Sequence, residues 1–340
     1  MRTSNITEPR PRVFVLNDTR RNYHHGSSRV MENLFAILSE YGALLTGTVA
    51  NTCDWRSSQT AKDQIRRSDW VIINGEGTMH HGKKAIDRML SIAEEFDVKC
   101  ALVNSIWQSN THAQAERLRR FRFVQVRDLR SQSELRDVGI DACYAPDLTF
   151  YRTSDSIRAS LSPACIGITD SVYPDVTAKL LETCSSQNIR PWVYLPMTIP
   201  VTEHGDHKAT KRLIRNWFSQ RFKKMHPKTL QVTSPADYLG LLRSCDAVIT
   251  GRFHALCFCI QCEIPFRCIQ SNSHKIQSLL GDVGLDFGRF MIAPKDAADL
   301  LASGDTQWRF DESEIEKIRQ FNRTATDRIK LSYQPIADEK

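Results

Sequence analysis

The sequence predicts an α/β protein made of two doubly wound domains that face each other across a cleft. Short apolar runs alternate with helix-length amphipathic segments along most of the chain, which is typical of parallel sheets covered by helices. The length of 340 residues is large for a single core and suggests two domains of ordinary size. In such folds ligands bind at the carboxyl ends of the strands, so we look for polar motifs that directly follow a strand.

The first predicted domain covers residues 1–155. Its apolar runs indicate buried strands, and the amphipathic segments between them indicate helices. The expected strands are residues 12–16, 43–49, 70–73, 100–103 and 123–126, and the expected helices are 28–41, 84–96, 113–120 and 131–138. Around residues 151–163 the periodicity lapses into polar residues, which predicts a linker.

The second predicted domain covers residues 156–310 and continues the same alternation. Its expected strands are residues 165–169, 192–195, 230–233, 247–249 and 266–269, with a helix at 175–187 after the first of them. Residues 311–340 hold a long helix of mixed charge at 312–331, which we expect to pack across both domains.

Composition indicates a folded soluble protein, with 41% hydrophobic and 25% charged residues. A net charge of +7 is a mild bias toward anionic partners and comes with no nucleic-acid-binding signature. We find no signal peptide and no span of about 18 apolar residues, so we expect a cytosolic protein with reduced cysteines. The cysteines at 257, 259, 262 and 268 lie in an apolar segment, which favours buried thiols over a metal site.

Residues 246–285 carry the strongest functional signal. An apolar run reaches a break at Thr250 and Gly251, and a nearly uncharged helical segment with Arg252 and His254 follows at once. Such a helix start attracts anions, and the planar guanidinium of Arg252 matches a phosphate or carboxylate. His254 is of the residue type that transfers protons near neutral pH. The alternative is that Arg252 pairs with a neighbouring carboxylate and His254 is a hydrogen-bonded core residue.

Two more segments follow predicted strands and open helices, as an anion site requires. Arg127 stands at the end of one strand, next to the start of a helix. Ser271, Asn272, His274 and Lys275 lie between another strand and helix, where they would suit a phosphate. Helix capping explains Ser271 and Asn272 equally well, so His274 and Lys275 carry the prediction.

The turn at residues 75–82 is the candidate for binding an acceptor. It lacks the lysine of a P-loop, and its glycine spacing is not that of the dinucleotide fingerprint. Gly75 and Gly77 let the backbone approach a ligand closely, and Glu76, His80 and His81 could bind sugar hydroxyls or take a proton from one. A tight turn with a solvated histidine pair is the alternative.

A basic segment at residues 207–228 combines eight Lys and Arg residues with an apolar helical stripe and has no acidic residue. This composition is typical of a helix on an anionic membrane surface, such as the inner face of the cell membrane. A domain helix with its apolar stripe in the core fits equally well.

These motifs together resemble the polysaccharide pyruvyl transferase family. The resemblance runs from about residue 13 to 285 and rests on ITGRFHALCFCI with IQSNSHKIQSLLGDVGL, on VRDLRSQSELRDVGI and on INGEGTMHHG. It implies a fold similar to GT-B glycosyltransferases, with two Rossmann-like domains. It also implies transfer of the enolpyruvyl group of phosphoenolpyruvate onto two hydroxyls of a sugar, with no cofactor. By motif, Arg252, Phe253 and His254 resemble the donor-binding and acid/base triplet, and Arg127 resembles a second donor-binding arginine.

The N-terminal region departs from the family pattern. Many relatives carry Asn-x-Gly-Asp near the first helix, whereas this chain has HHGSS at residues 24–28 and an Asn17-Asp18 pair. We expect Asn17, Asp18 and His25 on the acceptor side, although a helix-capping turn is the simpler account of HHGSS. The acceptor is expected to be a sugar of a cell-surface polysaccharide or its lipid- or nucleotide-linked precursor.

Two other functions remain open at this point. A nucleotide-sugar-dependent glycosyltransferase would share the architecture and would need a uridine or cytidine pocket in the second domain. A glycan-binding scaffold has no need of a proton donor beside its anion site, so the presence of both Arg252 and His254 counts against it.

Overall fold

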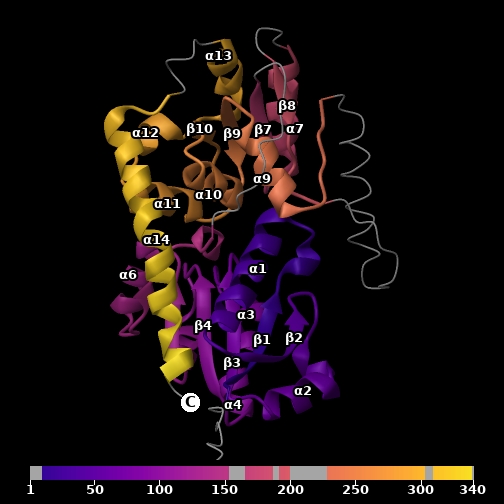
Figure 1. Ribbon diagram of the computed structural model, residues 1–340, viewed down its shortest axis with the longest axis vertical. Coiled ribbons are helices and arrows are strands. Elements are labelled where there is room, and N and C mark those ends of the chain that lie inside the picture. The colour runs from indigo at the N-terminus through magenta and orange to yellow at the C-terminus, as the bar shows by residue number, and fades with distance from the viewer. Residues whose placement is uncertain (1–9, 153–164, 187–190, 200–227, 303–308, 339–340) are drawn as a thin grey trace, which may run out of the picture. The chain divides into compact units, whose positions relative to one another are not determined.

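The computed structural model describes residues 10–152, 165–186, 191–199, 228–302 and 309–338. The chain divides into two compact units (Figure 1). The first unit consists of Met1–Arg21, Met31–Tyr151 and Ala325–Lys340, and the second unit consists of Asn22–Val30 and Arg152–Thr324.

The first unit is built on a parallel sheet with the strand order β2-β1-β3-β4-β5-β6. Its strands are β1 (Arg12–Asp18), β2 (Leu44–Ala50), β3 (Trp70–Glu76), β4 (Lys99–Ser105), β5 (Phe123–Val126) and β6 (Cys143–Tyr144). Its helices include α2 (Gln59–Arg66), α3 (Lys84–Leu90), α4 (Ile92–Glu95), α5 (His112–Leu118) and α6 (Leu129–Asp137). The chain order reverses between β1 and β3, which makes this pair the topological switch point where ligands bind in open α/β sheets.

The second unit has a parallel sheet with the order β10-β9-β7-β8 and a switch point between β7 and β9. Its strands are β7 (Ile166–Ser171), β8 (Trp192–Tyr194), β9 (Ala247–Gly251) and β10 (Phe266–Cys268). Its helices include α7 (Pro174–Ser186), α9 (Pro235–Arg243), α10 (Phe253–Gln261), α11 (Lys275–Val283), α12 (Phe287–Phe290) and α13 (Ala297–Ala302).

Two helices contribute residues to both units. Helix α1 (His25–Glu40) has its first turns in the second unit and its remainder in the first. Helix α14 (Glu312–Asp338), drawn in yellow in Figure 1, passes from the second unit into the first between Thr324 and Ala325.

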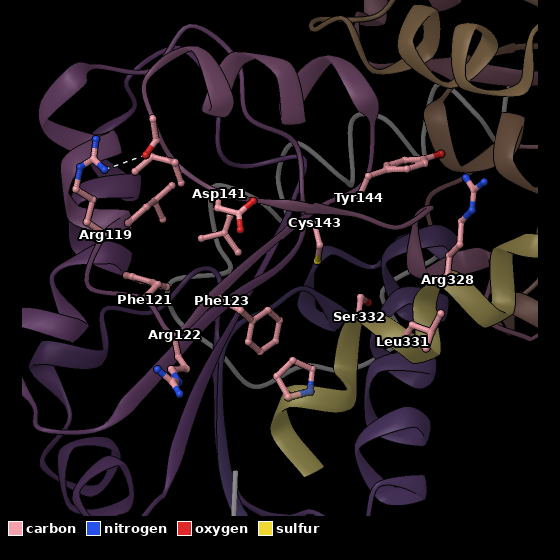
Figure 2. A pocket seen from close by; sticks show the side chains of 15 residues that line it. Arg119, Phe121, Arg122, Phe123, Asp141, Cys143, Tyr144, Arg328, Leu331 and Ser332 are labelled. Atoms are coloured by element: carbon pink, nitrogen blue, oxygen red, sulfur yellow. Dashed lines mark hydrogen bonds between the residues drawn. The ribbon is translucent and has the colours of Figure 1, made fainter. Parts of the chain in front are cut away.

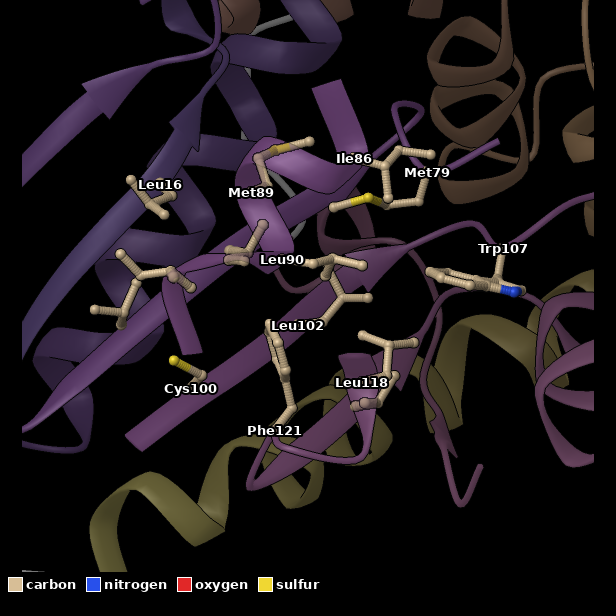
Figure 3. Packing of buried hydrophobic residues seen from close by; sticks show 14 of the residues in the cluster. Leu16, Met79, Ile86, Met89, Leu90, Cys100, Leu102, Trp107, Leu118 and Phe121 are labelled. Atoms are coloured by element: carbon tan, nitrogen blue, oxygen red, sulfur yellow. The ribbon is translucent and has the colours of Figure 1, made fainter. Parts of the chain in front are cut away.

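Each sheet is covered by apolar side chains, because the strands of a parallel sheet are buried on both faces. Every residue of β3 is buried, and Figure 3 shows Leu16, Met89, Leu90 and Leu102 in the cluster of the first unit. The second unit has its own cluster, formed around β7, β9 and α7. In α10 all residues from Phe253 to Ile260 are buried, so the thiols of this helix are core residues, as expected.

The predicted strands and helices are mostly confirmed, with two corrections. The strand expected at residues 230–233 is wrong, because only the preceding Thr229 forms an isolated bridge with Tyr194. Beyond that bridge the segment lies partly exposed, and Ser234 soon caps the start of α9. The helix expected at residues 84–96 is divided at Ser91, whose side chain bonds Glu95 and the carbonyl of Arg88.

Several expectations concern residues outside those that the structure describes. The linker at 151–163 lies outside them beyond residue 152, and the basic segment at 207–228 lies outside them up to residue 227. Among the described helices, none combines the length and the apolar character that crossing a bilayer requires.

A cavity of about 630 Å³ lies in the first unit at the start of β5, away from the carboxyl ends of the strands (Figure 2). Apolar residues such as Phe121, Phe123 and Leu331 line it together with the guanidinium groups of Arg119 and Arg328. Arg119 binds Glu116 and the carbonyls of residues 138 and 139, so its charge is engaged in holding the loop after α6.

Candidate active site

An arginine and an aspartate form an ion pair at the switch point of the second unit. Arg252 follows the last residue of β9, and Asp170 lies near the end of β7. The Nε of Arg252 donates to Oδ2 of Asp170 at 2.9 Å, and Nη2 donates to the same oxygen. The backbone N–H of Met197 donates to the other carboxylate oxygen at 2.8 Å. The carboxylate therefore fixes the guanidinium at the carboxyl edge of the sheet.

This ion pair leaves part of the guanidinium available to a ligand. The side chain of Arg252 is 21% exposed, and its Nη1 has no hydrogen-bond partner among the described residues. The close approach of β9 to β7 depends on Gly251, because a Cβ there would lie 2.8 Å from Cβ of Ser171. Arg252 is thus both an ion-pair partner and a donor that can reach an anion.

His254 lies on the first turn of α10, beside the ion pair, and is 8% exposed. Its ring packs edge to face against the rings of Phe253 and His24, with centroid distances of 5.3 and 5.5 Å. The backbone of Gly26 presses against it, since a Cβ at that position would lie 2.2 Å from Cβ and Cγ of His254. The imidazole is therefore held in one place by residues from a distant part of the sequence.

The segment that carries His24 is held by pairing with the chain after β8. The N–H of His25 donates to the carbonyl oxygen of Met197 at 2.9 Å. The N–H of Ile199 donates to the carbonyl oxygen of Tyr23 at 2.6 Å. Between these bonds His24 and Thr198 form an antiparallel bridge. This pairing brings the HHG motif to the switch point of the second unit.

His25 lies in a core-like environment at the start of α1. It is 1% exposed, and its ring stacks on Tyr238 with a centroid distance of 4.4 Å. Burial lowers the pKa of His25 to about 4, although Asp170 and Asp237 act in the opposite direction. The imidazole is neutral at pH 7.

The stability of the protein is expected to fall between about pH 6.5 and about pH 4 because of His25. The folded pKa lies below the ordinary value of 6.5, so in this window the unfolded chain binds a proton that the folded chain does not. The loss should reach about 3 kcal/mol and should be absent above this window. Urea denaturation at several pH values measures it. The His25→Phe variant, which can still stack on Tyr238, should show a smaller loss, and an equal loss in both proteins would contradict the assignment.

The polar segment after β10 lies next to Arg252 at the same edge of the sheet, because β10 pairs with β9. The Nζ of Lys275 donates to Oδ1 of Asn272 at 3.0 Å, and Ser271 donates to the same oxygen at 3.4 Å. His274 is buried at the N-cap position of α11. The amide of Asn272 thus holds the ammonium group at the start of the helix.

In the first unit, Asn17 connects β1 to the turn after β3. Its Nδ2 donates to the carbonyl of Asn74 at 2.5 Å and lies 3.3 Å from Oγ1 of Thr78. Asn17 and Glu76 both have positive φ angles, 64° and 41°. Such strained backbone is retained where surrounding contacts demand it and is frequent at functional sites. Gly75 is required here, because a Cβ would lie 2.3 Å from Oγ of Ser105.

The side chain of Asp18, at the end of β1, is occupied by Arg20. Nε and Nη2 of Arg20 bind the carboxylate, with an Nη2 to Oδ2 distance of 2.5 Å. Burial alone would raise the pKa of Asp18, but the hydrogen bonds from Arg20 lower it below its ordinary value.

His80 and His81 form a hydrogen-bonded chain with Lys83. The two Nδ1 atoms are 2.5 Å apart, and Nε2 of His80 is 2.6 Å from Nζ of Lys83. A charged lysine can only donate a hydrogen bond, so Nε2 of His80 is the acceptor from Lys83. The proton of neutral His80 is then on Nδ1, which donates a hydrogen bond to Nδ1 of His81. The turn therefore presents a short proton-transfer chain that ends at the exposed ring of His81.

Arg127 is buried in an ion pair with Asp147 in the first unit. Nη1 lies 2.7 Å from Oδ2, and the two side chains are 1% and 0% exposed. Oδ1 of Asp147 accepts from the N–H of Thr149. Nη2 of Arg127 would lie 3.7 Å from a Cβ on Gly77, so the guanidinium sits beside the candidate acceptor turn.

The structure groups the predicted site residues at the two switch points. In the second unit it brings together Arg252, Phe253 and His254 and places His25 against Tyr238. In the first unit it brings Arg127 and Asn17 to the turn after β3. The roles assigned to these residues stay predictions. Sequence reasoning missed Asp170 and Lys83, and it noted His24 only as part of the segment HHGSS, whose alternative was a helix-capping turn. A carboxylate directly after a predicted strand was the available signal for Asp170.

Comparisons with known proteins agree with this architecture. The family model described as polysaccharide pyruvyl transferase matches residues 24–273. No curated protein matches the chain. Sucrose-phosphate synthase from Thermosynechococcus elongatus is similar in structure, with 10% identity, a TM-score of 0.57, and coverage of 97% of this chain and 100% of that chain.

Two further solved structures show the same fold. The Anabaena protein HepE in complex with UDP and glucose has 10% identity and a TM-score of 0.51, covering 97% of this chain and 98% of that chain. An α-glucosyltransferase in complex with UDP and DNA has 10% identity and a TM-score of 0.52, covering 98% of this chain and 100% of that chain. At such identities the likeness concerns the fold alone, and it confirms the predicted GT-B-like pair of Rossmann-like domains.

Proposed function

Because this chain belongs to the polysaccharide pyruvyl transferase family, we propose that it transfers the enolpyruvyl group of phosphoenolpyruvate onto a sugar to form a pyruvate ketal. The observation that carries the proposal is the position of Arg252 and His254, side by side at the switch point of the second unit. The acceptor is a sugar of a cell-surface polysaccharide or of its lipid- or nucleotide-linked precursor in the cytosol.

The residue chemistry supports phosphoenolpyruvate as the donor, since it carries a phosphate and a carboxylate. Arg252 offers Nη1 to one of these anions while Asp170 holds its Nε and Nη2. Lys275 and the start of α11 lie at the same edge of the sheet and suit a phosphate. Arg127 is proposed as the second donor-binding arginine by its motif, and its guanidinium lies beside Gly77.

The reaction requires one acid and two hydroxyl nucleophiles. His254 gives a proton to C3 of phosphoenolpyruvate, which becomes a methyl group and leaves a cationic centre at C2. One sugar hydroxyl attacks C2 and loses its proton, and the C–O bond to phosphate then breaks. The second hydroxyl attacks the same carbon, loses its proton and closes the ketal. Arg252 and the helix start stabilise the departing phosphate, so the proposed steps require no metal or cofactor.

The acceptor is proposed to bind in the first unit. Glu76, His80 and His81 follow β3 at the switch point of that unit. The chain from His80 to His81 provides a route for a hydroxyl proton. Asn17 contributes by holding this turn in its strained conformation.

A nucleotide-sugar-dependent glycosyltransferase is the second candidate. The likeness to HepE in complex with UDP and glucose favours it, because the fold is shared over nearly the whole chain. The same carboxyl edge of the second unit would then hold a nucleoside diphosphate.

Incubation with a sugar acceptor separates the two functions. With phosphoenolpyruvate we expect release of inorganic phosphate and an acceptor whose mass rises by one pyruvate ketal. With UDP- or CDP-sugars we expect no release of nucleoside diphosphate. Release of nucleoside diphosphate without phosphoenolpyruvate turnover, across a panel of acceptors, would replace the first function by the second.

A further inference from the structure

His24 has a well-defined local role at the start of α1. Its Nδ1 accepts a hydrogen bond from the N–H of Ser27 at 3.4 Å, and its carbonyl accepts from the N–H of Ser28 at 2.9 Å. It therefore occupies the N-cap position, with the ring nitrogen in the place of a capping oxygen. Because Nδ1 accepts, the neutral imidazole carries its proton on Nε2.

The surroundings of His24 disfavour a second proton. Burial holds its pKa well below the ordinary value, and the charges of Arg252 and His254 act in the same direction. His25 lowers the pKa of His24 to a smaller extent, and Asp170 acts in the opposite direction. The positive end of α1 also favours the neutral form.

The position of His24 is set by groups from several elements. Its backbone pairs with Thr198, and its ring lies with its centroid 5.5 Å from that of His254. Gly26, two residues on, packs against the Cβ, Cγ and Nδ1 atoms of His254. His24 as a residue is partly exposed, so a small ligand that reaches His254 also comes close to His24.

The charged groups of the site favour a neutral hydrogen-bond donor at His24. The positive charge of Arg252 is already balanced by Asp170, so the pair alone offers little net attraction to an anion. A charged His24 would repel a protonated His254 at this distance. A neutral N–H donor at His24 adds a hydrogen bond to the anion without repelling the proton that His254 carries.

We infer that His24 binds the anionic donor substrate as a hydrogen-bond donor through Nε2–H, because its Nδ1 is occupied as the cap of α1. The partner is a phosphate or carboxylate oxygen of the donor. Of the two neighbouring histidines, His254 transfers a proton and His24 does not. The inference rests on the proposed function only for the identity of the donor, since any ligand with an exposed phosphate can accept a hydrogen bond from Nε2–H of His24.

The tautomer of His24 tests the first half of the inference. Nitrogen-15 NMR of the imidazole side chains, assigned by the His24→Asn variant, should show a neutral Nε2–H ring across the pH range in which an ordinary histidine becomes charged. A ring that gains a proton in this range, or one protonated on Nδ1 when neutral, overturns the inference whatever reaction the protein performs.

Two matched variants test the second half. In His24→Asn the amide oxygen can replace Nδ1 as the cap, while the Nε2–H donor is lost. In His24→Gln the longer amide places an N–H near the position of Nε2. By titration calorimetry with phosphoenolpyruvate, His24→Asn should bind about 10- to 100-fold more weakly at unchanged thermal stability, and His24→Gln should recover part of the loss.

Inorganic phosphate as a second probe separates this inference from the proposed function. If the wild-type protein binds phosphate but not phosphoenolpyruvate, and His24→Asn weakens phosphate binding, the inference stands and the proposed donor is wrong. If phosphoenolpyruvate binds equally well to the wild-type protein and to His24→Asn, the inference fails and the proposed function stands. Binding of neither ligand overturns both.

Discussion

Replacement of His254 by glutamine is expected to lower kcat for phosphoenolpyruvate turnover by about 10²- to 10⁴-fold, the usual contribution of one general acid. Glutamine keeps a polar group of similar size against Gly26 and His24, so the surrounding contacts persist. The Arg252 and Asp170 pair does not involve His254 and remains to bind the donor. Steady-state phosphate release gives kcat, and calorimetric titration gives donor affinity.

The matched control is His112→Gln, because His112 is 77% exposed on α5 and lies far in the sequence from the candidate site. It should retain the wild-type kcat. A His254→Gln variant that folds normally and turns over at the wild-type rate would remove His254 from the proton-transfer step. A variant with normal kcat and weaker donor binding would instead assign His254 to binding.

Replacement of Arg127 by methionine is expected to lower the free energy of unfolding by about 3–5 kcal/mol, because it leaves the carboxylate of Asp147 buried without its cation. The double variant Arg127→Met with Asp147→Asn should recover much of this loss, since a whole buried pair can be replaced at little cost. Urea denaturation measures both. The exposed pair of Arg66 and Asp63 is the control, and Arg66→Met should cost about 1 kcal/mol or less.

The same variants distinguish stability from substrate binding at Arg127. If Arg127 also binds the donor, the double variant should fold well and still bind phosphoenolpyruvate weakly. Wild-type donor affinity in the stable double variant would restrict Arg127 to holding Asp147 and the loop around Thr149. Little loss of stability in Arg127→Met would show that Asp147 takes up a proton or another partner.

The fold was predictable because its strands are buried on both faces and read as continuous apolar runs. In β3 the run Trp70–Ile73 is apolar, and the following polar residues are also buried because they close the switch point. The local sequence pattern wrongly predicted a strand at residues 230–233. Only Thr229, just before them, pairs with Tyr194 of β8, and the pairing does not continue. The local pattern also failed at Ser91, whose hydroxyl competes for backbone groups and interrupts the helix.

The candidate site was predictable only where it is local in sequence. Arg252 and His254 are two residues apart after a strand, so the motif is visible without the fold. The partner of Arg252 is Asp170, 82 residues earlier, and no local pattern links the two. His24 reaches the ring of His254 only because residues 23–25 pair with residues 197–199, a contact set by tertiary structure.

The way the chain is shared between the two units has a practical consequence for dissecting the protein. A fragment that begins at Arg152 would lack residues 22–30, and with them the glycine and the histidine that enclose the ring of His254. A fragment that ends at Tyr151 would lack the last part of α14, which belongs to the first unit and binds the carbonyls of Phe150 and Tyr151 through Thr326. Separate production of either half therefore requires grafting short distant segments, because a single cut leaves both halves incomplete.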